Sequence, residues 1–182
     1  MRIGYLLFAG MLSVLSAGCV LATDNSAVVE MSNPVTVSGK VKIEWQQPHQ
    51  YTDIRSATEL QQRFEQRLFD SLTKTLDKAA AKVLKGNETL ELVVTDVDLA
   101  GDLRPTFGKG PASDIRIVKD IYPPRINFSY RLLDGEQVIM VGSEKLRDMS
   151  FMDRISKIDN SSFKYEHALL KEWFAKTIAP RM

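Results

Sequence analysis

The chain has 182 residues, with 24 Lys and Arg against 23 Asp and Glu, and a single cysteine. This length predicts one domain with a substantial apolar core. The balanced charge excludes a protein that binds nucleic acid through bulk electrostatic attraction, and the single cysteine excludes intramolecular disulfides as a source of stability.

Residues 1–18 have the pattern of a signal peptide. Arg2 precedes an apolar stretch over residues 3–15, and three small residues, SAG, follow it. The apolar stretch is well short of the ~20 residues that a permanent membrane-spanning helix needs. We therefore expect this segment to direct export and then to be removed, with cleavage either before Cys19 or after Ala22.

Two forms of the mature protein are possible, and they differ in whether Cys19 is kept. The residues before it resemble a lipobox, although Leu15 lies one place too early and Ser16 occupies the position usually held by leucine. A lipobox implies that acylated Cys19 holds the protein at a membrane. Val20, rather than aspartate, follows the cysteine, which by resemblance to known sorting signals implies an outer membrane lipoprotein facing the periplasm. The alternative is a leader cysteine that is removed, which leaves a soluble periplasmic protein.

We expect residues 19–39 to form a tether and residues 40–182 to form a single α+β domain. The segment from Thr23 to Ser38 is small, polar and mixed in character, which is typical of a flexible link. Residues 40–45, KVKIEW, alternate polar and apolar side chains and predict a half-buried strand that begins the domain.

A long helix and a second strand are predicted next. Ser56 and Glu59 have the spacing of a capping box, and apolar residues then recur every three or four positions up to Leu84. Gly86 follows as a residue that favours helix ends. Residues 90–99, LELVVTDVDL, predict a buried strand. This succession predicts a crossover that places both strands in one sheet.

The remaining elements complete a two-layer fold. Residues 101–113 are rich in Gly and Pro and predict a loop, residues 114–121 and 126–133 predict strands, and Asp134-Gly135 predicts a hairpin turn into a strand over 136–146. Residues 162–178 predict a helix. The order β-α-β-β-β-α predicts an α+β two-layer sandwich, with two helices on one face of a mostly antiparallel sheet.

Three carboxylates form the most suggestive polar stretch. Asp96, Asp98 and Asp102 could converge on a cation, with Gly101 at the sixth position of a calcium-type loop. The twelfth position is Phe107, where such a loop needs glutamate, and the acids alternate with apolar residues as a strand requires. We therefore favour acids on the exposed edge of a strand and keep a metal site at these three residues as the alternative.

The other motifs point to structure rather than chemistry. The chain has two histidines, no GxSxG nucleophile elbow and no phosphate-binding loop, so we expect no cofactor. Trp45, Tyr51 and Asp53 form either a ligand-binding lip or a packed corner between strand and helix, and we favour the corner.

Five spaced segments are similar to those of a known family. In order and spacing they resemble the domain of unknown function 3016 family of exported Gram-negative bacterial proteins. The resemblance implies an envelope location and carries over no activity or site residue. The segments are WQQPHQYTDI at 45–54, TDVDLAG at 95–101, IYPPRI at 121–126, LRDMSF at 146–151 and YEHALLKEWF at 165–174.

Two functional hypotheses follow from the sequence. The first is a non-enzymatic envelope lipoprotein, attached to the membrane via acylated Cys19, whose domain binds an envelope protein partner or another envelope component and no nucleic acid. The alternative is a periplasmic hydrolase that uses carboxylates, with or without a metal ion.

Overall fold

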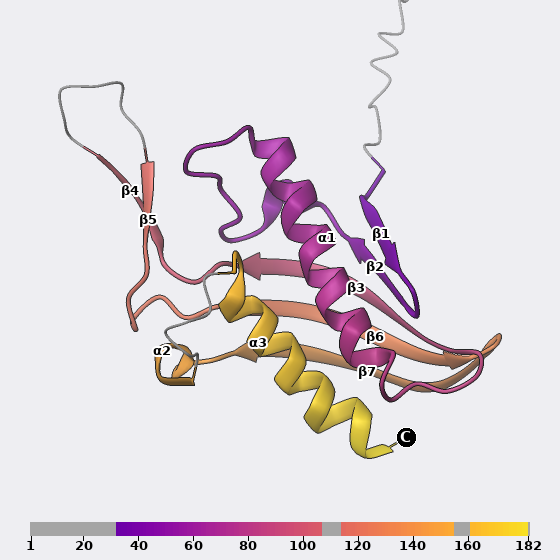
Figure 1. Cartoon of the computed structure of the whole chain (residues 1–182). Coiled ribbons are helices and arrows are strands. Elements are labelled where there is room, and N and C mark those ends of the chain that lie inside the picture. The colour runs from indigo at the N-terminus through magenta and orange to yellow at the C-terminus, as the bar shows by residue number, and fades with distance from the viewer. Residues whose placement is uncertain (1–31, 107–113, 155–160, 182) are drawn as a thin grey trace, which may run out of the picture. The chain divides into compact units, whose positions relative to one another are not determined.

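Five strands form the central sheet of the computed structural model, which describes residues 32–106, 114–154 and 161–181. Strands β2 and β3 are parallel, and the other neighbouring pairs are antiparallel. The predicted α+β class and mostly antiparallel sheet are therefore confirmed. In spatial order the strands are β1 (Val35–Ser38), β2 (Val41–Trp45), β3 (Glu88–Asp98), β6 (Arg125–Asp134) and β7 (Gln137–Arg147) (Figure 1).

Strand β1 lies within the range that the sequence analysis assigned to the tether, so the sheet begins before Lys40. Thr36 explains why this short strand is held in place. Its side chain is buried, accepts a hydrogen bond from the Trp45 indole nitrogen at 2.9 Å, and lies 2.6 Å from the Thr73 hydroxyl on the neighbouring helix. The polar composition of the segment gives no indication of these tertiary contacts, so a strand was not predicted here.

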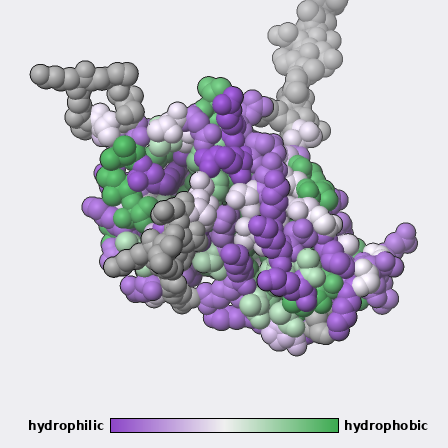
Figure 2. Space-filling model, in the orientation of Figure 1, coloured by the Kyte–Doolittle hydropathy of each residue, from purple (hydrophilic) through white to green (hydrophobic). Residues whose placement is uncertain are grey.

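Two helices cover one face of the sheet, as predicted. Helix α1 (Gln61–Ala80) connects the parallel strands β2 and β3, and helix α3 (Lys164–Trp173) packs beside it (Figure 1). The predicted apolar stripe of α1 is buried against the core, whereas its outward face is largely hydrophilic (Figure 2). A π-helical turn, Phe174–Ile178, continues α3, and a short helix, α2 (Phe151–Arg154), follows β7.

The ends of α1 differ from the prediction. The Ser56 hydroxyl accepts a hydrogen bond from the Glu59 N–H at 3.0 Å, as in a capping box, but this bend precedes the helix. Gln61, rather than Glu59, accepts the returning hydrogen bond from the Ser56 N–H at 2.9 Å. At the other end the helix stops at Ala80 and a turn leads into β3.

A second, two-stranded sheet corrects the predicted element order. Strands β4 (Asp102–Pro105) and β5 (Asp114–Ile117) pair with each other, in the region predicted to be a loop and a strand of the main sheet. The chain leaves β3 at Gly101, whose φ of +90° few other residues adopt. The Gly101 N–H donates a hydrogen bond to the Tyr122 carbonyl at 3.0 Å, which joins the two ends of the segment that contains β4 and β5. Strand β5 is the start of the strand predicted over 114–121, but it lies in the second sheet, and the predicted order β-α-β-β-β-α lacks β4.

Aromatic side chains fill much of the space between the sheet and the helices. The Trp45 ring stacks on Phe69 with 4.2 Å between centroids, and Trp173 lies edge-on to Phe128 and Tyr130. Gly142 lies opposite Tyr130, and a Cβ atom there would be 2.6 Å from the tyrosine oxygen, so this position needs glycine. Within the described ranges, no helix is long and apolar enough to cross a membrane.

The opposite face of the sheet carries a polar cross-strand row. Lys42, Glu91 and Arg131 are adjacent across β2, β3 and β6. Glu91 pairs with Lys42 at 3.6 Å and with Arg131 at 2.7 Å. Such partly exposed pairs contribute little individually to stability, so this row chiefly keeps the open face soluble.

Candidate functional site

The three acids proposed as a cation site each have a separate partner. Among the described residues, no group of three or more histidine, cysteine, aspartate or glutamate side chains is placed to hold a metal ion. A shared cation at these three acids is therefore not favoured. Two other residues considered in the sequence, Phe107 and Cys19, lie outside the described residues. Asp96 accepts hydrogen bonds from the N–H and the hydroxyl of Thr52, at 2.8 and 3.1 Å. Asp98 accepts a hydrogen bond from Arg125 Nε at 2.8 Å. Asp102 forms an ion pair with Arg104 at 2.7 Å.

The Trp45, Tyr51 and Asp53 cluster divides into two parts. Trp45 and Tyr51 are buried, and the Tyr51 hydroxyl donates to the Val94 carbonyl at 2.9 Å. Burial is the main reason that the pKa of Tyr51 is raised, so its phenol stays neutral. These two rings form the packed corner that we favoured over a ligand lip. The side chain of Asp53 takes part in an ion cluster with two arginines.

Asp53 joins the main sheet to the second sheet. Its backbone extends the sheet beyond β2 through a bridge to Asp98. Its carboxylate accepts two hydrogen bonds from Arg116 on β5, at 2.9 and 3.2 Å, and one from the Arg55 N–H at 3.1 Å. Burial tends to raise the pKa of Asp53, but the hydrogen bonds and charges of Arg116 and Arg55 outweigh it and lower the pKa below 3.8. Asp53 is therefore ionised at neutral pH.

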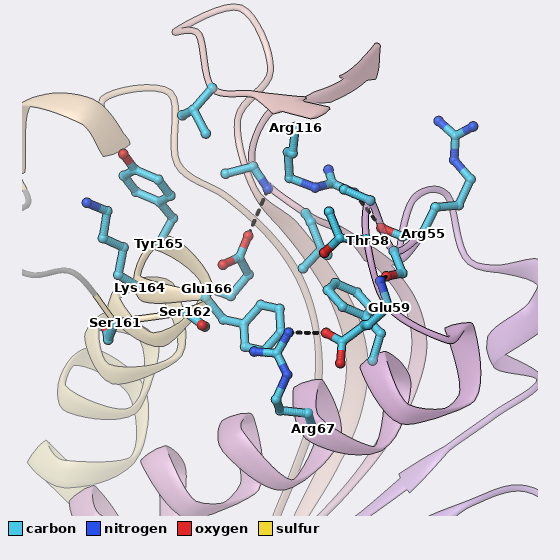
Figure 3. Close-up of a pocket in the computed structure, with 17 residues that line it drawn as sticks. Arg55, Thr58, Glu59, Arg67, Arg116, Ser161, Ser162, Lys164, Tyr165 and Glu166 are labelled. Carbon is cyan, nitrogen blue, oxygen red and sulfur yellow. Dashed lines mark hydrogen bonds and ion pairs between the residues drawn. The ribbon is translucent and has the colours of Figure 1, made fainter. Parts of the chain in front are cut away.

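Arg116 also lines a cavity of about 260 Å³, which we call the arginine pocket. Residues 55–59 and the first turns of α1 form one wall, and the end of β3, strand β5 and the start of α3 form the others (Figure 3). Its apolar surface comes mainly from Phe64, Leu99, Val118 and Phe163. Four cationic side chains line the same cavity: Arg55, Arg67, Arg116 and Lys164.

The cations of the arginine pocket are held by nearby groups. Arg67 pairs with Glu59 and lies over the ring of Phe163, with its guanidinium carbon 5.0 Å from the centroid (Figure 3). The ammonium nitrogen of Lys164 lies 5.2 Å from the Tyr165 ring centroid. The aromatic faces orient these two cations beside the cavity, and Arg67 is in addition paired with a carboxylate.

Glu166 is the buried acid of the pocket. Its carboxyl is 2% exposed and accepts a hydrogen bond from the Ala100 N–H at 2.8 Å (Figure 3). Burial, opposed by the Ala100 hydrogen bond, its own N–H and the charge of Arg116, raises the pKa of Glu166 above 4.5. The acid therefore favours its neutral form more than an exposed glutamate does, which leaves the surroundings more positive.

The N-terminus of α3 adds hydrogen-bond donors to this cavity. Phe163 precedes the helix with a φ of 59°, and no cap hydrogen bond from a side chain is found there within the described residues. The first N–H groups of a helix have no partner within the helix, and together they favour negative charge. Residues 161–166 line the pocket, so the positive end of α3 and the cationic side chains act on the same space.

The comparisons with known proteins identify the family. A family model described as protein of unknown function (DUF3016) matches residues 39–176. The chain belongs to this family. The match spans strands β2 to β7 and every residue that lines the arginine pocket, and it confirms the resemblance found in the sequence. No curated protein and no solved structure matches the chain.

The sequence analysis missed the residues of the arginine pocket, although one of them left a signal. Glu166 lies three positions after Phe163 and three before Leu169, so an acid interrupts the apolar face of the predicted helix. Such a position requires either a partner or a raised pKa. Arg116 left no comparable signal. It lies between Ile115 and Ile117, and strand alternation predicts that the two isoleucines, rather than the arginine, face the interior.

Proposed function

We propose that this domain is a non-enzymatic binding module of the cell envelope that captures a small organic anion in the arginine pocket. The observation that carries the proposal is the placement of four cationic residues and a helix N-terminus around one partly apolar cavity. Glu59 and Glu166 are the two acids that line it, and Glu166 favours its neutral form. The pocket therefore attracts negative charge.

The dimensions of the arginine pocket restrict the ligand. Its volume of about 260 Å³ is near the lower end of the ~300–1,000 Å³ that small-molecule sites occupy. Phe64 and Phe163 meet edge to face, with 5.5 Å between centroids, and offer an apolar surface beside the cations. These features suit a carboxylate or phosphate attached to a compact apolar body, either a whole small molecule or the anionic end of a longer one.

Replacement of Arg67 by glutamine is expected to weaken anion binding by about tenfold to a hundredfold, because a hydrogen bond to a charged group contributes ~1.5–3 kcal/mol. Calorimetric titration with benzoate and phenyl phosphate measures the effect, and benzyl alcohol serves as the uncharged match. Arg63→Gln on the exposed face of the same helix is the control and should bind as the natural protein does. Equal binding of benzyl alcohol, or an unchanged affinity in Arg67→Gln, would contradict the proposal.

We further propose that the protein is an outer membrane lipoprotein anchored through Cys19, with its domain in the periplasm. The lipobox-like residues before Cys19 support this location, and several acyl chains would make attachment effectively permanent. We expect the intact mass of the native protein to include lipid and the protein to partition into detergent, whereas Cys19→Ala loses both properties. A native chain that begins at Thr23 without lipid would contradict the anchor and leave the binding proposal standing.

A carboxylate-dependent hydrolase is the second candidate. Glu59 and Glu166 line one cavity, and burial raises the pKa of Glu166, as a general acid requires. Glu59 forms an ion pair with Arg67 and would serve as the second carboxylate. Turnover of a phosphoester, glycoside or peptide substrate that disappears in Glu166→Gln would favour the hydrolase over the binding module.

A further inference from the structure

Strand β7 forms one edge of the central sheet. It has 11 residues and pairs with β6 on one side (Figure 1). Within the described part of the chain, no other strand pairs with β7. An unpaired edge presents a row of main-chain donors and acceptors, and the chemical group that matches such a row is another extended polypeptide.

A groove of about 320 Å³ runs beside this edge, between β7 and the C-terminal half of α3. The strand contributes four consecutive residues, 144–147, to its lining, and Asp148 follows them. Because successive strand residues point to opposite faces, a groove that contacts all four follows the edge of the strand rather than one face. Leu169 and Trp173 contribute the apolar wall on the helix side.

Trp173 contributes an independent observation. Its side chain is 4% exposed, and its indole nitrogen is buried with no hydrogen-bond partner among the described residues. Buried donors without a partner are uncommon in folded proteins. The nitrogen itself is enclosed, so an added strand would contact other atoms of this residue, which lines the groove.

The groove as a whole has three acids (Glu144, Asp148, Glu172) and three bases (Lys145, Arg147, Lys176), so the charge of the partner is set by the two cations on the exposed face of β7. Lys145 and Arg147 are two residues apart and therefore point to the same face of the sheet. Neither cation forms an ion pair with another residue in the described ranges, and Arg147 lies opposite a third cation, Arg125. A strand added beside β7 would place its own residues next to these cations, where acidic side chains are favoured and basic ones are opposed.

We propose that β7 accepts an extended segment of a partner protein as an added strand of the sheet. The segment carries acidic residues at alternate positions, facing Lys145 and Arg147, and apolar residues at the positions between them, facing Leu169 and Trp173. The groove is lined by the second half of α3, whereas the arginine pocket is lined by its start, so this interaction does not depend on the anion site.

The test uses the mature protein and a synthetic peptide of 11 residues, the length of β7, in which glutamate alternates with valine and threonine and both ends are blocked. We expect the peptide to slow amide hydrogen exchange over residues 137–147 and to shift the indole N–H resonance of Trp173. The double variant Lys145→Glu, Arg147→Glu should bind it at least about tenfold more weakly. Lys78→Glu, Lys82→Glu, which reverses two exposed cations elsewhere, should bind it normally.

A charge-swapped peptide separates a specific edge interaction from a folding defect. With lysine in place of glutamate, the peptide should bind the Lys145→Glu, Arg147→Glu variant and not the natural protein. Failure of this rescue, or exchange that slows outside β7, would overturn the proposal. Protection of β7 that rises with protein concentration in the absence of peptide would also overturn it, because a second copy of the chain would then occupy the edge.

Discussion

Replacement of Arg116 by methionine is expected to lower the free energy of unfolding by about 3–5 kcal/mol, because it leaves a buried carboxylate without its principal partner. Asp53 is 8% exposed, and two of its hydrogen bonds come from Arg116. Urea unfolding followed by circular dichroism measures the change. Since Arg116 is on β5 and Asp53 extends the main sheet, we also expect faster amide exchange in β4 and β5.

Two further variants show whether the loss arises from the unpaired charge. Asp53→Asn combined with Arg116→Met removes both charges and should recover part of the stability, since replacement of a whole buried pair costs less than removal of one member. Arg104→Met is the matched control on the same hairpin, where the pair with Asp102 is exposed and contributes ~0–1 kcal/mol. Equal losses in Arg104→Met and Arg116→Met would contradict the special role of Asp53.

The pH dependence follows from the lowered pKa of Asp53. A carboxyl whose pKa is lower in the folded state than its ordinary 3.8 stabilises the fold above that value, and this contribution is lost as the pH falls through the folded pKa. In Arg116→Met the main lowering influence is absent and burial acts to raise the pKa. The destabilisation by Arg116→Met should therefore shrink as the solution is acidified toward the pKa of Asp53.

The sequence predicted the elements whose pattern is local. The stripe from Phe64 to Ala80 and the alternation in KVKIEW lie in regular elements that bury one face, and their periodicity gave the class and the two layers. The hairpin turn predicted at Asp134-Gly135 lies one residue later, at Gly135 and Glu136. The structure adds the short strands β1 and β4, and it places the predicted strand over 114–121, present as β5, in a second sheet with β4. Each of them is held by a contact across the chain, such as that of Thr36 with Trp45, which periodicity does not contain.

The candidate site was less predictable for the same reason. Arg55, Arg116 and Glu166 are separated by 61 and 50 positions in the chain, and only the packing of β5 and α3 brings them together. The cation site considered from the sequence consisted of three acids that are close together in the chain, Asp96, Asp98 and Asp102. In the structure each of those acids has its own partner: Thr52 for Asp96, Arg125 for Asp98 and Arg104 for Asp102.

Replacement of Glu166 by glutamine is expected to change how stability depends on pH. The pKa of Glu166 is raised above 4.5 in the folded state, so its favourable contribution is present below that value and is lost as the pH rises through the folded pKa. Glutamine still offers an oxygen to the Ala100 N–H and does not ionise. The free energy of unfolding of Glu166→Gln relative to the natural protein should therefore increase between about pH 5 and about pH 8.

Glu166→Leu isolates the hydrogen bond from the charge. Leucine fills similar space but leaves the buried Ala100 N–H without an acceptor, which costs about 1–3 kcal/mol even in acid, where the natural glutamic acid is neutral. Urea unfolding across the pH range measures both variants. Parallel pH profiles for the natural protein and Glu166→Gln would show that Glu166 does not titrate with a raised pKa. The arginine pocket would then hold an additional negative charge, and binding of benzoate should be stronger in Glu166→Gln.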